Sequence, residues 1–210
     1  MASNVDERKA IWYVLRELHR GGQDWIRNTQ GSDEVRIAAE RRFSPLGEHD
    51  LERHLRHGAE SGDFGQQALY VTPPRLECEA AAAIWCKWYF GNEQAACWFY
   101  LGLWLAERGF VGFRYEMPES GGNHNYYHSQ PCQTMGSRDE VIPGALAVPE
   151  RNPTWPLVAK SALELLLCLV VSIHGMNGLS QLKSDMMKDA AIRQDQLLKD
   201  AIEGVLTIRV

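Results

Sequence analysis

The chain has 210 residues, a formal net charge of −5 at pH 7 and a pI near 5.8. Hydrophobic residues make up 45% of it and charged residues 23%, which is ordinary for a soluble globular protein. This length suits one domain whose core needs neither metals nor disulfides. The negative net charge argues against a broad nucleic-acid-binding face and leaves only a local basic patch for that role.

The cysteine content and the apolar runs indicate a cytoplasmic protein. The five cysteines are odd in number and form no CxxC pair, so we expect a reducing compartment and no disulfide framework. The first ten residues are polar and do not resemble a signal peptide. The longest strongly apolar run, residues 162–173, falls short of the ~20 residues that span a bilayer. We therefore expect no membrane span.

The first third of the chain predicts helices followed by a short strand. Apolar residues recur at helical spacing over residues 4–20, and Gly21-Gly22 is expected to end that helix. Two further helices are predicted over residues 32–43 and 44–60. Residues 68–72 then predict a short strand, bounded by two prolines.

The middle of the chain predicts a buried helical pair and a hairpin. Residues 75–90 and 92–108 are apolar nearly all round and rich in tryptophan, which is typical of helices buried in a core. Residues 109–116 alternate as a strand does, and a Gly-rich turn leads to a second strand near residue 130. Residues 133–152 predict a long loop.

The last third predicts more helix. Ser161 and Glu164 have the capping-box spacing, and the helix that they begin should close at Gly175 and Gly178. A long amphipathic helix is predicted over residues 181–203, and a terminal strand over 205–210.

Together these elements predict an α+β fold: a mostly helical single domain with a small antiparallel sheet. The sheet would consist of the hairpin at about 109–130 and short strands near 68–72 and 205–210. Within one domain spanning 1–210, we expect an N-terminal helical subregion over 1–66 and a core over 67–210.

The hairpin is the richest part of the sequence in groups that bind or transfer protons. On a regular strand, His124, Tyr126, His128 and Gln130 would share one face. A symmetric turn would place Phe113 opposite His128. Histidine beside tyrosine and a carboxylate can act as a general acid or base near neutral pH. The candidate catalytic residues are His128, His124, Glu116, Arg114 and Tyr126, and the bland alternative is an ordinary hairpin carrying aromatic residues.

The same spacing argues against a metal site. His124 and His128 would lie ~13 Å apart on a straight strand, too far for one ion. We therefore expect no metal and no cofactor. Cys132 with His128 as its base is a loose nucleophile hypothesis, since many residue pairs satisfy it.

Other candidate binding residues lie outside the hairpin proper. His54 and His57 would share a helix face, which is either a solvated charged face or a patch for a partner's phosphate or carboxylate. Seven tryptophans favour some aromatic surface at an interface. The candidate binding residues are Trp12, Trp25, Trp155, His54, His57 and Gln130, and a contiguous exposed patch of aromatic residues is expected around Trp12, Trp25 or Trp155.

The sequence lacks the P-loop, the dinucleotide-binding glycine motif, the H-E-x-x-H motif and the nucleophile elbow. We therefore expect a small cytosolic protein-interaction subunit of a larger assembly, with a protein partner or a second copy of itself. Its overall character is that of a bacterial accessory protein of a defence or mobile-element operon, although no motif carries this expectation. The alternative is an acid–base enzyme that acts on a phosphate-containing or nucleic-acid substrate through the hairpin.

Overall fold

The computed structural model describes residues 4–28, 67–71, 81–90, 95–105, 109–118, 125–132 and 154–207. It confirms the predicted α+β class, because helices and an antiparallel sheet are both present and helices account for more of the described residues. The predicted helices over 32–43 and 44–60 and the predicted loop over 133–152 lie outside those ranges. The elements are α1 (Asn4–Asn28), β1 (Gln67–Val71), β2 (Ala81–Phe90), β3 (Ala95–Leu105), β4 (Gly109–Glu116), β5 (His128–Cys132), β6 (Trp155–Pro156), α4 (Ala162–Met186), α5 (Ala190–Arg193) and α6 (Gln196–Leu206).

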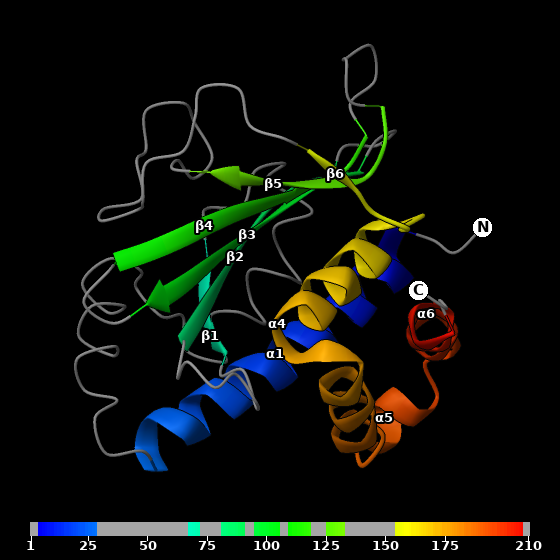
Figure 1. Ribbon diagram of the computed structural model, residues 1–210. Helices are drawn as coiled ribbons and strands as arrows, with labels where there is room; N and C mark the ends of the chain where they lie inside the picture. Colours follow the sequence, from blue (N-terminus) through cyan, green and yellow to red (C-terminus); the bar gives the residue numbers. More distant parts are fainter. Residues whose placement is uncertain are drawn as a thin grey trace.

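The sheet is a six-stranded meander in which each strand pairs antiparallel with the next along the chain. Its first strand confirms the one predicted at residues 68–72. Figure 1 shows the sheet as one layer with α1 and α4 crossing the same face. The opposite face of the sheet therefore carries no helix among the described residues.

The predicted helical pair at 75–90 and 92–108 is wrong, because these runs contain the two longest strands, β2 and β3. They pair over their whole shared length, from Ala81 opposite Trp104 to Phe90 opposite Ala95. A short run that is apolar on both faces fits a buried strand as well as a buried helix. The aromatic content and the Gly-Asn dipeptide between two runs of similar length were the signals that favour a hairpin.

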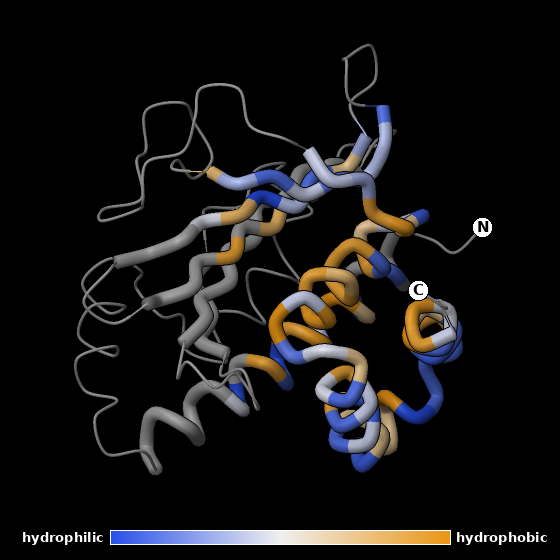
Figure 2. The backbone as a smooth tube through the Cα atoms, in the orientation of Figure 1, coloured by the Kyte–Doolittle hydropathy of each residue, from blue (hydrophilic) through white to orange (hydrophobic). Residues whose placement is uncertain are grey.

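One hydrophobic core joins the two ends of the chain. It unites α1, α4 and α6 with the helix-facing residues of the sheet, among them Phe99, Leu101 and Tyr115. Hydrophobic residues concentrate along α4 in Figure 2. Glu7 of α1 also accepts a hydrogen bond from the backbone N–H of Leu163 (3.0 Å), which ties α1 to the start of α4. The predicted division at residue 66 stays a prediction.

The N-terminal helix extends further than predicted. The expected apolar positions, Ile11, Val14, Leu15 and Leu18, are all buried. However, α1 does not end at Gly21-Gly22 and continues to Asn28. A glycine ends a helix when the chain turns left-handed there, and Gly175 is the only glycine with positive φ among the described residues.

The predicted start of α4 is confirmed, since the Ser161 hydroxyl accepts from the backbone N–H of Glu164 (3.2 Å). At Gly175 the backbone leaves the helical region (φ 66°, ψ 178°), and a second helical segment then runs to Met186. The expected closure at Gly175 is therefore a kink rather than an end, and Gly178 lies within the second segment.

The C-terminal predictions need two corrections. The single helix over 181–203 is interrupted, because Asp189 and Asp195 each cap a new helix, α5 and α6. The terminal strand at 205–210 is wrong over its described part, because α6 continues to Leu206; residues 208–210 lie outside the described ranges. Buried Leu198, Ala201 and Val205 keep helical spacing up to the first residue of the predicted strand.

By length and composition, α4 is apolar enough to cross a bilayer, with a mean hydropathy of 1.7 over its most apolar window. Within the protein, 56% of that window is buried. Core helices of globular proteins share these properties, so this feature alone assigns no location.

Candidate functional site

The register between β4 and β5 brings four polar side chains together. Glu116 lies opposite His128, and Arg114 lies opposite Gln130. The predicted register is wrong by three residues, because Phe113 faces Pro131 instead of His128. Residues two apart on a strand share a face, so all four side chains project from the face that α1 and α4 do not cover. We call Arg114, Glu116, His128 and Gln130 the β4–β5 polar cluster.

The Glu116 carboxylate is the centre of this cluster. Its Oε2 accepts a hydrogen bond from the Gln130 amide (2.9 Å) and lies 3.2 Å from His128 Nε2. Its Oε1 lies 3.5 Å from Arg114 Nε, in an ion pair. Three donor-bearing side chains therefore surround one carboxylate.

The cluster is buried apart from its arginine. Glu116 is 7% exposed and His128 1%, while the Arg114 side chain remains 30% exposed. A buried carboxylate is tolerated only when hydrogen bonds and opposite charges compensate its lost hydration. The arrangement meets that requirement, and it also ties β5 to β4.

The orientation of the His128 ring is set by the backbone. A carbonyl oxygen can only accept, so Nδ1 donates to the carbonyl of Tyr126 (3.0 Å). The second ring nitrogen, Nε2, then faces the Glu116 carboxylate. Both ring nitrogens therefore face oxygen atoms of the site.

Two predicted members of the shared strand face fall elsewhere. Tyr126 precedes the start of β5, and its hydroxyl hydrogen-bonds that of Thr154 (2.9 Å). It still touches the site, because its ring meets that of His128 edge-on at 5.4 Å. His124 lies outside the described residues.

Cys132 does not fit the nucleophile hypothesis. Burial raises the pKa of its thiol to about 12, although nearby Arg114 opposes the shift. The thiol is therefore protonated near neutral pH, and thiolate is the reactive form. Within the described ranges, no three histidine, cysteine or acidic side chains are grouped so that they could hold a metal ion.

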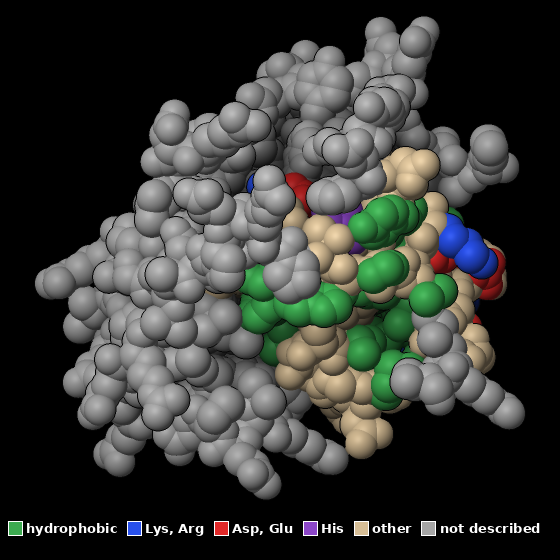
Figure 3. All heavy atoms as spheres, turned by 45° about the horizontal axis from the view of Figure 1, so that its top comes forward, with side chains coloured by type: hydrophobic (Ala, Val, Ile, Leu, Met, Phe, Trp, Pro, Cys, Tyr) green, Lys and Arg blue, Asp and Glu red, His purple; other side chains and the backbone are tan. Residues whose placement is uncertain are grey.

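The tryptophans predicted to bind a partner differ in exposure. Trp155 is exposed (46%), and so is Val158 (66%), whereas Trp12 is half-buried against the core beneath Arg16. The Trp25 side chain, His54 and His57 lie outside the described part. Figure 3 turns the β5–β6 end of the sheet toward the viewer and shows hydrophobic side chains gathered on that face.

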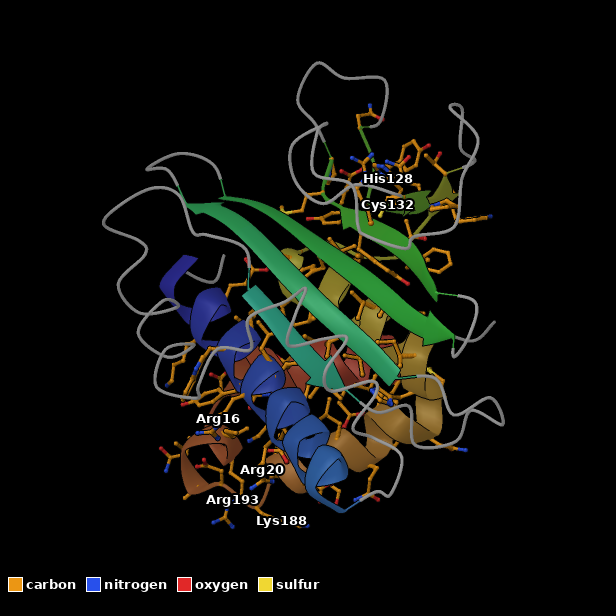
Figure 4. The ribbon with its side chains drawn as sticks, turned by 90° about the vertical axis from the view of Figure 1, so that its left-hand side faces the viewer. Arg16, Arg20, His128, Cys132, Lys188 and Arg193 are labelled. Carbon is orange, nitrogen blue, oxygen red and sulfur yellow. The ribbon has the colours of Figure 1, made fainter. Side chains whose placement is uncertain are left out.

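A second group of charged residues was not predicted from the sequence. Three ion pairs lie where α1 meets the α4–α5 turn, and Arg193 lies beside them. Figure 4 shows these cations at the end of the molecule opposite His128 and Cys132. The i, i+4 spacing of Arg16 and Arg20 was the available signal. We call these pairs the helix-end ion pairs: Arg16–Asp189, Arg20–Glu17 and Lys188–Asp185.

Comparison with protein-family models, curated proteins and solved structures finds no match to this chain.

Proposed function

We propose that this protein is a subunit that docks onto another protein through the segment from Trp155 to Val158. The observation that carries the proposal is the exposure of both of these apolar side chains at the edge of the sheet. Pro156 between them is exposed too. Exposed aromatic anchors of this kind contribute much of the binding energy at protein interfaces.

The local structure supports a rigid docking segment. Pro156 lies opposite His128 in the β5–β6 ladder, and the backbone N–H of Leu157 donates to the carbonyl of Tyr127 (2.8 Å). Leu157 also packs against the core. A segment held this way loses little conformational entropy on binding. The partner that fits it is a protein with an apolar pocket for the Trp155 ring.

The test is affinity purification from the native host with the wild-type chain and a Trp155→Ser/Val158→Ser variant. We expect a stoichiometric partner with the wild type and at least a tenfold loss with the variant, since anchor residues contribute about 2 kcal/mol or more. Arg193→Ser, an exposed change at the opposite end of the molecule, is the matched control. Partner recovery that is equal in all three samples would contradict the proposal.

A second candidate function is acid–base catalysis on a phosphate-containing substrate, which the convergence of His128, Gln130 and Arg114 on Glu116 favours. We expect turnover of phosphomonoesters or phosphodiesters that falls by about 10²-fold in His128→Gln, the range for a lost acid–base group. No turnover of either ester class, or full activity in the variant, would refute this function.

A further inference from the structure

We propose that the outer nitrogens of Arg114 bind an oxyanion, the phosphate or carboxylate group of a small ligand. The Nε atom of Arg114 is buried and lies beside Glu116 Oε1, yet the side chain as a whole is 30% exposed. Solvent therefore reaches the arginine at atoms other than Nε. Within the part of the chain that the structure describes, neither terminal nitrogen makes a hydrogen bond, and the contact with Glu116 lies at Nε.

The charges of the cluster favour an anion as the missing partner. Glu116 is the one carboxylate in it, and it is shared by the Arg114 guanidinium, the His128 ring and the Gln130 amide. Because Glu116 divides its two oxygens among three side chains, it meets Arg114 only through a 3.5 Å contact at Nε. An anion at the exposed end of Arg114 would pair with the guanidinium more directly.

The chemistry of the ligand follows from the guanidinium. Its planar fork of N–H donors matches two oxygens of a carboxylate or phosphate, and Arg114 is fixed from behind by Glu116. The half-buried position strengthens such a contact, because the surrounding dielectric is lower than in water.

The helix-end ion pairs are a poorer candidate for an anion site. Arg16, Arg20 and Lys188 each have a carboxylate of their own within the group. An incoming anion would have to displace those partners. Arg114 differs because its contact with Glu116 lies at Nε, and its terminal nitrogens make no hydrogen bond to another described residue.

The experiment is calorimetric titration of the full chain with inorganic phosphate and with acetate, at constant ionic strength. We expect saturable binding at one site and at least a tenfold weaker affinity in Arg114→Gln, since hydrogen bonds to charged groups are the stronger kind. Arg193→Gln is the matched control and should bind as the wild type does. Phosphate binding alone assigns a phosphate-bearing ligand, and acetate binding alone assigns a carboxylate.

A readout in the wild type guards against misfolding of the variant. The side-chain Nε–H resonance of Arg114 should move during the same titration, while that of Arg193 should not. If neither anion binds, or if an anion binds without moving the Arg114 signal, the proposal is wrong. Anion binding requires neither turnover nor Trp155, so this outcome is separate from both proposed functions.

Discussion

The molecule carries charged groups in two contrasting settings. The β4–β5 polar cluster is buried, and several donors share the single carboxylate of Glu116. The helix-end ion pairs lie at the opposite end of the molecule, where each cation has its own carboxylate and Lys188 is 73% exposed. In the β4–β5 polar cluster, three donor side chains share one carboxylate. At the helix ends, each cation is paired with a carboxylate of its own.

The contrast predicts where a substitution should change the stability of the fold most. Exposed pairs contribute little because water and salt screen them, whereas a buried charge must be compensated or it destabilises the fold. At the helix ends, hydrogen bonds from Arg16 and from the N–H of Ala191 lower the pKa of the Asp189 carboxyl, the arginine bond having the larger effect. That aspartate is thereby occupied as a cap and as an ion-pair partner. The buried cluster is the place where a change should have large effects.

The largest expected effect is that of Glu116→Ala. The change removes the acceptor shared by His128, Gln130 and Arg114, and breaking a buried pair costs about 3 kcal/mol or more. Urea denaturation measures the loss in unfolding free energy. Glu203→Ala removes an exposed carboxylate paired with Lys183, and it should cost at most about 0.5 kcal/mol. Equal losses in the two variants would show that burial does not determine how much a paired carboxylate contributes to stability.

His174 of α4 offers a second test of how burial affects stability, because its ring nitrogens are buried and make no hydrogen bond to another described residue. Burial lowers the pKa of His174 from 6.5 to about 4. Between pH 6.5 and about 4, His174 is therefore protonated in the unfolded chain but not in the folded chain. Stability should fall by about 3 kcal/mol as the pH drops from 6.5 to 4, and change no further from this group below that.

His174→Leu should remove this part of the acid sensitivity. Denaturation midpoints measured at several pH values between 7 and 4 compare the two chains. The wild type should lose more stability across this range than the variant. Parallel curves would show that His174 is not the group responsible.

The smallest effect is expected for Lys188→Gln at the helix ends. Lys188 donates to Asp185 (2.6 Å) at a well-exposed site, and such pairs contribute about 0.5 kcal/mol or less. The difference should shrink further in 1 M NaCl, where the Debye length is about 3 Å. Thermal denaturation at low and high salt measures both quantities. A larger loss of stability that persists in 1 M NaCl would show that this pair contributes as a buried pair does.

The sequence located the candidate site but not its geometry. Alternation over residues 109–116 predicted β4, and composition identified Arg114, Glu116 and His128. The pairing failed because a symmetric turn was assumed, whereas β4 ends at Glu116 and β5 begins at His128. A shift by an odd number of residues exchanges the faces of a strand, so the predicted register placed His128 on the same face as Phe113. The observed register places it opposite Glu116.

Two further features could not be predicted from the sequence: the strands β2 and β3, and the helix-end ion pairs. β2 and β3 were taken for helices because runs that are apolar on every side carry no periodicity to distinguish the two structures. The helix-end ion pairs depend on the tertiary packing of α1 against the C-terminal helices, since Arg16 and Asp189 are 173 residues apart. No local pattern contains that information.

Gly175 is an exposed residue whose identity is set by a torsion angle. A Cβ atom built there would meet nothing within 4 Å, so space does not restrict the position. The restriction is φ of 66° with ψ of 178°, a conformation that essentially only glycine adopts. Invariance of a surface residue among related chains is usually taken as a sign of binding. At this corner of α4 it would record only the direction in which the chain turns.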